Sequence, residues 1–197
     1  MSRPGHAVSA GLRDAFADEA VRALSRRYFV SNGFDGALTA VGVVVGAVLS
    51  GVPDGLTVVR IGAGAAVGLA TSGLWSVWEI ERAEKRAELL RIERAMLVDL
   101  DDTRPDRRRR HARVLNAAAS GAGPVVGIFL PLIPFLFEGE TLTMVEAGVA
   151  GVTVASLVLF AFGAYLGALS ERRWWVAGLR MGLAGLAVAG LTLVLPG

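Results

Sequence analysis

Long apolar stretches alternate with short polar ones along the chain, and their lengths predict the fold class. Crossing a hydrocarbon core of roughly 30 Å takes about 20 helical residues, because each adds about 1.5 Å along the axis. Five stretches reach that length, with ends defined to within a few residues: Tyr28–Ser50, Thr57–Trp78, Val114–Phe137, Met144–Leu169 and Trp174–Leu195. The pattern therefore predicts an all-α integral membrane protein with five transmembrane helices.

Composition supports this prediction. Hydrophobic residues make up 53% of the 197 positions, the mean hydropathy is +0.53, and the chain holds 25 Gly. Most charged residues fall in 1–27 and 79–113, so the apolar stretches are nearly free of charge. This segregation excludes a single water-soluble globule. Cysteine is absent, which also excludes disulfides, thiolate metal sites and cysteine nucleophiles.

Basic residues predict how the spans are oriented, because Lys and Arg in short loops are retained on the cytoplasmic side. Residues 1–27 contain five Arg and residues 79–113 contain eleven Lys and Arg, whereas the connections at 52–55 and 138–140 contain none. Arg172 and Arg173 mark the last loop. We therefore expect a cytoplasmic N-terminus and a C-terminus on the outside.

The same distribution predicts how the chain is organised. We expect residues 1–27 to form a cytoplasmic N-terminal segment without a cleavable signal peptide, because they lack an apolar core. Residues 28–197 are expected to form the five-helix transmembrane domain, in which 79–113 is a helical cytoplasmic extension and loop. Arg107–Arg110 are expected to anchor this loop to the anionic lipid bilayer and not to bind nucleic acid. The expected location is the plasma membrane of a prokaryote.

The sequence carries no motif of soluble-type catalysis. It has no Walker loop, no nucleophile with its base and no dinucleotide fingerprint. We therefore expect neither an enzyme nor a bound cofactor.

Asp35 is a carboxylate inside the first span, about 10 Å along the helix from its start. A charge at that depth is costly unless it faces protein, water or a cation, so Asp35 is a functional candidate. Thr39 follows at i+4 and Asn32 precedes at i−3, which predicts a stripe of oxygen donors, with room left by Gly33 and Gly36. Oxygen donors suit hard or borderline divalent cations. The alternative is a protonated or hydrogen-bonded Asp35 with a structural role.

The second span continues in strong helix formers, without Gly or Pro, as far as Pro105. One long helix is therefore expected to project into the cytoplasm. Glu81, Glu84 and Glu88 recur at i, i+3 and i+7, which predicts an acidic stripe near the membrane surface that can collect cations. The alternative is an ordinary solvated helix with ion pairs such as Glu81–Lys85.

Proline and glycine predict how the helices pack. The third span contains Pro124, Pro131 and Pro134, and each frees a carbonyl four residues earlier, so we expect a kinked or broken helix that can line a conduit. Glycines spaced four apart let helices approach closely in lipid. They predict a compact bundle, with a dimer face as the alternative, at five places: Gly42/Gly46, Gly64/Gly68, Gly123/Gly127, Gly163/Gly167 and Gly178/Gly182.

Taken together, these features resemble the vacuolar iron transporter family. The resemblance covers roughly residues 26 to 195 and includes the five spans, the acidic extension of the second span and these segments: Ser31-Asn-Gly-Phe-Asp-Gly-Ala-Leu-Thr, Leu130-Pro-Leu-Ile-Pro-Phe, Ala155-Ser-Leu-Val-Leu, Gly163-Ala-Tyr-Leu-Gly-Ala-Leu and Gly178-Leu-Arg-Met-Gly-Leu. It implies a homodimer that moves Fe²⁺, and often Mn²⁺, out of the cytoplasm in exchange for protons, along a path at the dimer centre.

The resemblance also implies site residues, of which Asp35 matches the family's first-span carboxylate. The family's usual Ser-Met followed by Gly-Glu-Tyr stands here as Ser72-Gly73 and Ser76-Val77-Trp78. Glu79 and Glu81 follow as candidate substitutes, and the larger cytoplasmic metal domain is reduced to 79–113. In the leading hypothesis, Asp35 binds metal and releases protons, two hydroxyls supply neutral oxygens, and the glutamates guard the cytoplasmic mouth. The expected metal-binding residues are Asp35, Thr39, Ser72, Glu79, Glu81, Glu84 and Glu88.

Two other classes of function remain open. The absence of the second-span Met and Glu favours a membrane scaffold or regulator that keeps the fold without transport. Asp35 without a soft Met ligand favours a transporter of a harder small cation.

Overall fold

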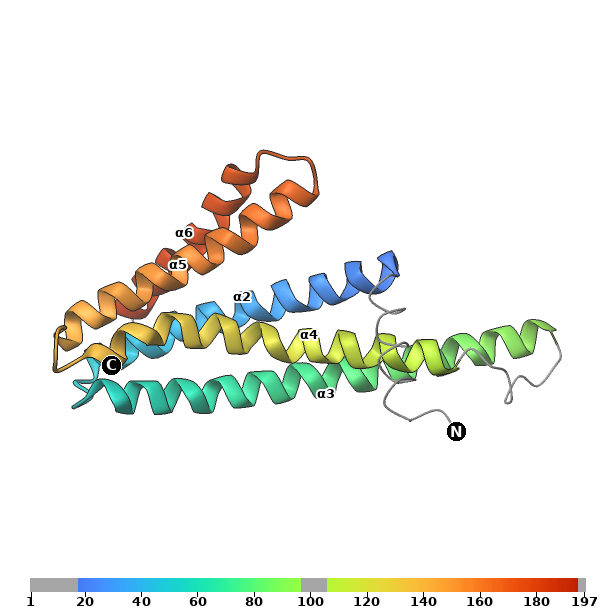
Figure 1. Cartoon of the computed structure of the whole chain (residues 1–197), viewed down its shortest axis with the longest axis horizontal. Helices are drawn as coiled ribbons and strands as arrows, with labels where there is room; N and C mark the ends of the chain where they lie inside the picture. The colour runs from blue at the N-terminus through green and yellow to red at the C-terminus, as the bar shows by residue number, and fades with distance from the viewer. Residues whose placement is uncertain (1–17, 97–105, 195–197) are drawn as a thin grey trace, which may run out of the picture.

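The computed structural model describes residues 18–96 and 106–194, and within these ranges the chain is an assembly of long helices without a strand (Figure 1). In chain order the elements are α2 (Glu19–Leu49), α3 (Gly55–Met96), α4 (Asp106–Leu132), the 3₁₀ helix η1 (Ile133–Phe137), α5 (Met144–Leu169) and α6 (Trp174–Val194). Five helices are long and apolar enough to cross a membrane. The predicted all-α class and the number of spans are confirmed.

Three of the helices, α2, α3 and α4, extend beyond the predicted spans. α2 begins at Glu19 because Asp18 caps it, with Asp18 Oδ1 accepting a hydrogen bond from Ala20 N at 3.0 Å. α3 runs unbroken from Gly55 to Met96, which confirms the prediction of one long helix. Residues 1–17 of the predicted N-terminal segment, the loop at 97–105 and the side chains of 106–110 lie outside what the structure describes.

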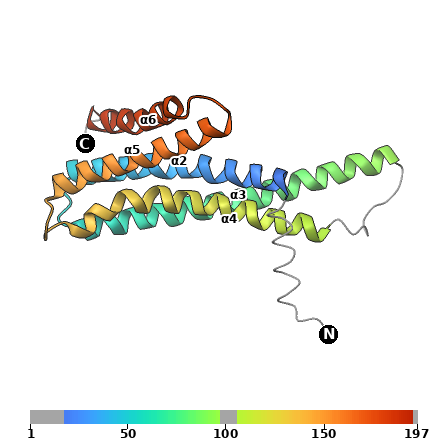
Figure 2. The same cartoon turned by 45° about the horizontal axis from the view of Figure 1, so that its top comes forward.

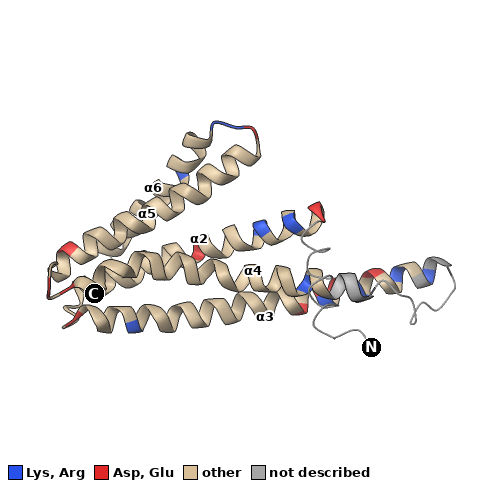
Figure 3. Ribbon diagram, viewed as in Figure 1, with Lys and Arg blue, Asp and Glu red and all other residues tan. Residues whose placement is uncertain are grey.

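The helices form two groups. α2, α3 and α4 lie side by side in one bundle, and the α5–α6 hairpin packs on α2 and α4 (Figures 1 and 2). We call the end that holds the connections 50–54 and 138–143 the acidic end, and the opposite end, where α2 begins and α3 continues to Met96, the extension end. Charged residues gather at helix ends and along the α3 extension (Figure 3).

At the acidic end, both connections are fastened to the start of α3. Asp54 Oδ1 accepts a hydrogen bond from Thr57 N at 2.8 Å, and Glu138 Oε2 accepts one from Gly55 N at 2.9 Å. Negative groups are favourable at a helix N-terminus, where backbone N–H groups lack partners inside the helix. The backbone hydrogen bond from Thr57 holds the pKa of Asp54 below its usual value.

The third span is broken, as its prolines predicted. Pro124 and Pro131 lie inside the helix, and the chain changes to η1 at Ile133, with Pro134 in the first turn. Pro124 cannot donate to the carbonyl of Ser120, four residues earlier. That carbonyl faces α3, because a Cβ at Gly73 would lie 3.1 Å from it. The freed group is therefore turned toward protein and away from lipid.

Three of the five glycine pairs pack against neighbouring helices of the same chain, as a compact bundle requires. Glycines of α4 pack on the α2 backbone, and glycines of α5 and α6 pack on each other's helix: Gly123/Gly127, Gly163/Gly167 and Gly178/Gly182. The other two pairs are Gly42/Gly46 on α2 and Gly64/Gly68 on α3. At these four glycines, no neighbouring atom of the described chain lies within 4 Å of an added Cβ. Three of the five glycine pairs thus pack within the fold, and the other two face outward.

Candidate functional site

Asp35 lies at mid-depth of the helical bundle. Its neighbour Gly36 packs against Pro124, since a Cβ at Gly36 would lie 2.7 Å from the Cα of Pro124. Pro124 is midway along the membrane-spanning stretch 111–137. The Asp35 side chain is nevertheless exposed on the surface of the chain. A carboxylate is therefore presented at the centre of an apolar layer.

The surroundings of Asp35 differ in part from the predicted stripe. Thr39 Oγ1 donates to the Asp35 backbone carbonyl at 2.8 Å, so this hydroxyl lies beside Asp35 but is bound to the helix itself. Asn32 Nδ2 donates to Ser120 Oγ of α4 at 2.7 Å and is used in the interior. Within the described residues, no hydrogen bond or ion pair reaches the Asp35 carboxylate.

The expectation that Gly33 and Gly36 leave room for Asp35 is wrong. Both glycines are buried in the interior: a Cβ at Gly33 would lie 2.7 Å from the Phe162 ring, and one at Gly36 would meet Pro124. On a helix, positions i+1 and i−2 point about 100° and about 160° away from position i. Gly36 and Gly33 therefore serve the packing of α4 and α5, while Asp35 points elsewhere.

Glu81 has the opposite environment, at the extension end. It is 5% exposed, although its neighbours at i+3 and i+7, Glu84 and Glu88, are exposed. Asn116 Nδ2 of α4 donates to Glu81 Oε1 at 2.5 Å, and Ser25 Oγ of α2 donates to Asn116 Oδ1 at 2.6 Å. Lys85 Nζ lies 3.9 Å from Glu81 Oε2, so the predicted Glu81–Lys85 pair is present. One carboxylate thus joins three helices.

The remaining expected site residues lie on the outer surface. Ser72 is exposed, and the exposed Glu79 carboxylate lies 3.8 Å from Arg82 Nη1. In the described part of the chain, no three His, Cys, Asp or Glu side chains come together as they would around a metal ion. The seven expected residues therefore do not form one closed metal centre within a single copy.

The sequence reasoning did not single out Asn116 or Ser25. Asn116 and Ser120 lie four residues apart in α4, among alanines and glycines, and both are buried. Polar residues at i and i+4 in a membrane span share a face and need partners from neighbouring helices. The i, i+4 spacing of Asn116 and Ser120 is therefore the sequence signal that could have identified these buried polar contacts.

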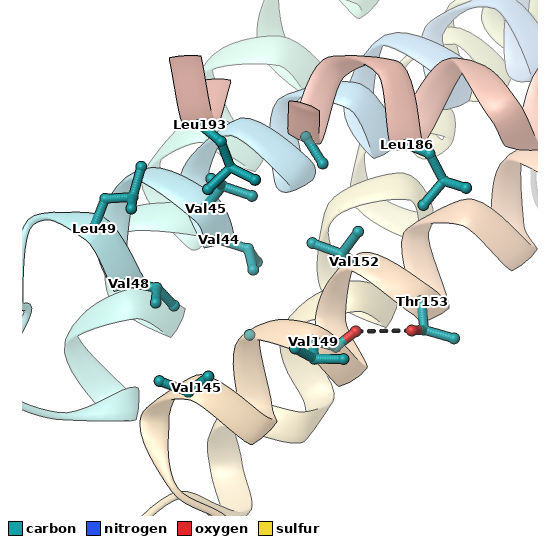
Figure 4. A pocket seen from close by; sticks show the side chains of 12 residues that line it. Val44, Val45, Val48, Leu49, Val145, Val149, Val152, Thr153, Leu186 and Leu193 are labelled. Atoms are coloured by element: carbon teal, nitrogen blue, oxygen red, sulfur yellow. Dashed lines mark hydrogen bonds between the residues drawn. The ribbon is translucent and has the colours of Figure 1, made fainter. Parts of the chain in front are cut away.

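An apolar cavity of about 380 Å³ lies between α2, α5 and α6 (Figure 4). Its walls are aliphatic, with Val44, Val149 and Leu186 among them, and the hydroxyl of Thr153 is bonded to the Val149 carbonyl at 2.8 Å. Such a lining gives a cation no free oxygen. The cavity is therefore not a candidate ion site.

Comparison with known proteins gives a family assignment. The VIT family model matches residues 79–196, which is more than half of the chain and spans the α3 extension, α4, α5 and α6. Asp35 and Ser72 lie outside the matched residues. An uncharacterized protein of Methanocaldococcus jannaschii is 29% identical over 167 residues, covering 83% of this chain and 84% of the relative. No solved structure matches the chain. The chain belongs to the VIT family, the vacuolar iron transporters.

Proposed function

We propose that the protein exports a divalent metal ion, Fe²⁺ or Mn²⁺, from the cytoplasm of a prokaryote across its plasma membrane by proton antiport. Family membership supports metal transport in general. The observation that carries the finer proposal is the exposed carboxylate of Asp35 at mid-depth. A charge exposed toward acyl chains is unfavourable, whereas one that faces an aqueous path or a cation is functional.

The working unit in this proposal is a homodimer with two copies of Asp35 at its centre. Asp35, Gly42 and Gly46 follow each other at i, i+7 and i+11, so they lie along one face of α2. No atom of the described chain covers the two glycines. Glycines at this spacing allow close helix contact in lipid, and a second α2 there would bring another carboxylate beside the first.

In the proposed dimer, the other expected residues either supply neutral oxygens or attract cations. Thr39 and Ser72 supply neutral oxygens for the ion. The charged extension of α3, with Glu79, Glu84 and Glu88, attracts cations at the cytoplasmic side. Long-range attraction of this kind raises the local ion concentration and weakens with salt. Two acidic groups close together also couple metal binding to proton release, because like charges cannot both remain ionised without a cation between them.

The test is metal-driven proton flux in proteoliposomes, measured with Mn²⁺ and a pH-sensitive dye for wild type, Asp35→Asn and the control Glu140→Gln. Glu140 is an exposed carboxylate in the 138–143 connection. We expect Asp35→Asn to lower the flux at least about tenfold and the control to leave it unchanged. Equal flux in wild type and Asp35→Asn removes Asp35 from the mechanism. Absence of flux in all three refutes transport of this metal.

A membrane scaffold or regulator is the second candidate function. It is favoured by the absence of any three-residue metal cluster among the described residues and by the missing Met and Glu of the second span. Calorimetric titration with Fe²⁺ and Mn²⁺ separates the two functions, because a scaffold binds neither ion in an Asp35-dependent way.

A further inference from the structure

The apolar cavity between α2, α5 and α6 has the volume and the lining of a site for hydrocarbon (Figure 4). An aliphatic cavity of about 150 Å³ stays dry and holds a molecule the size of benzene, and this one measures about 380 Å³. The Thr153 hydroxyl already donates to the Val149 carbonyl, so the lining leaves no side-chain polar group unsatisfied. A hydrocarbon ligand therefore fits the cavity better than water or an ion does.

The cavity opens on the surface of the chain at the depth of one bilayer leaflet. Val145 and Val149 of its α5 wall are 61% and 64% exposed. The α5 wall runs from Val145 to Thr153, which is about 12 Å along the helix axis. One leaflet contributes about 15 Å to a hydrocarbon core of roughly 30 Å. The wall therefore spans most of the leaflet at the acidic end, which suits one extended acyl chain.

Glu146 stands at the polar end of this wall. It precedes Val149 by three residues and Thr153 by seven, so the three residues share one face of α5. Glu146 Oε2 accepts hydrogen bonds from Thr143 N and Thr143 Oγ1 at 2.8 and 2.9 Å, which hold the exposed carboxylate in place. Its Oε1 has no partner in the described part of the chain. One carboxylate oxygen is therefore free to bind a positive group beside the cavity.

The charge at the acidic end discriminates between lipid headgroups. The connections 50–54 and 138–143 contain Asp54, Glu138 and Glu140 but no Lys or Arg. Together with Glu146, these carboxylates repel an anionic headgroup and attract an ammonium group. The charge and the apolar lining thus favour the same kind of ligand, a lipid with a positively charged group at its head.

We propose that this cavity binds one acyl chain of a phospholipid whose headgroup carries an ammonium group, and that this ammonium pairs with Glu146 Oε1. The bound chain contacts α2 on one side and the α5–α6 hairpin on the other, so it holds the hairpin on the bundle. It supplies dispersion contacts that the walls of an empty cavity lack. The site is separate from Asp35 and makes no use of the transported ion, so its failure leaves the proposed transport function untouched.

The test is a lipid titration of the delipidated full chain in detergent, in which native mass spectrometry measures the fraction that carries one lipid. The probes are phosphatidylethanolamine and phosphatidylglycerol with the same oleoyl chains, so they differ only in the headgroup. We expect the wild type to bind phosphatidylethanolamine about fivefold more tightly, as an exposed ion pair allows. Equal affinity of the wild type for the two lipids overturns the inference.

Variants of the cavity wall test where the acyl chain lies. Val149→Phe on α5 and Leu186→Trp on α6 place a ring in the cavity. Each should weaken the binding of both lipids about tenfold, which corresponds to the loss of about two buried methylene groups. The control is Leu157→Phe, because Leu157 is 61% exposed on α5 and lies outside the lining. If both wall variants bind lipid as the control does, the inference is overturned.

A variant of Glu146 tests the headgroup contact. Glu146→Gln should remove the preference for phosphatidylethanolamine without disturbing the start of α5, because Gln also completes a capping box. The control Glu171→Gln changes an exposed carboxylate at the other end of α5 and should keep the preference. A preference that survives in Glu146→Gln overturns the inference. So does a shift of the monomer–dimer ratio in the wall variants with unchanged lipid binding, because a second copy of the chain then fills the cavity.

Discussion

The two faces of α2 differ in whether their polar and small residues have partners within the chain. On the inner face, Ser25 and Asn32 reach partners on α4, and Gly33 packs tightly against α4 and α5. On the outer face, the Asp35 carboxylate has no partner in the described residues, and Gly42 meets nothing. One helix therefore carries a completed interface and an incomplete one.

This difference indicates where to look for binding from outside the chain. In a bilayer, polar groups must be satisfied by protein, by an aqueous path or by an ion. The inner face meets this requirement within one copy, as do most polar atoms of Ser25, Asn116 and Glu81. The outer face meets it only with a second copy, water or a cation. Substitutions on the two faces should therefore affect different measurements.

The largest effect is expected from the buried contacts that join Ser25, Asn116 and Glu81. Asn116→Leu leaves the buried Glu81 carboxylate without its hydrogen-bond donor and should lower the free energy of unfolding by about 3 kcal/mol. Unfolding in mixed micelles measures this loss. The double variant Glu81→Met/Asn116→Leu removes the uncompensated charge and should regain much of it. A double variant no more stable than Asn116→Leu contradicts the assignment.

A smaller effect is expected from the inner glycines. Gly36→Leu forces a side chain into the backbone of α4 near Pro124 and should cost about 2 kcal/mol. Gly190→Leu on α6 is the control, because Gly190 is exposed, lies outside the proposed dimer face and has nothing within 4 Å of an added Cβ. Its melting temperature in detergent should stay close to that of the wild type. Equal losses for both variants contradict the tight packing of the inner face of α2 on α4.

The smallest effect on stability is expected from single cysteine substitutions on the outer surface. They test the dimer contact directly by cross-linking. Because the chain has no cysteine, Gly42→Cys introduces a single thiol. In membranes this variant should form a covalent dimer with a short bifunctional reagent, whereas Leu191→Cys on the exposed surface of α6 should not. Denaturing gels of the treated membranes measure the fraction of covalent dimer. If only Leu191→Cys cross-links efficiently, the dimer contact does not include the Asp35 face of α2.

Much of the architecture could be predicted from local patterns. Length and hydropathy predicted all five spans, and the run of helix formers after Trp78 predicted the continuous α3. Pro124, Pro131 and Pro134 predicted a kinked or broken third span, and in the structure α4 gives way to η1 at Ile133. These features depend on backbone hydrogen bonding within a segment, which the segment's own residues control.

The sequence by itself determined that Asp35 is a charge placed inside an apolar helix, and that acidic residues continue beyond the second span. Only the tertiary structure decided that Asp35 is exposed and Glu81 is enclosed, and that Asn32 serves α4 while Thr39 stays beside Asp35. The physical reason is that helical periodicity specifies which residues share a face, whereas the neighbour that covers each face comes from residues far away in the chain.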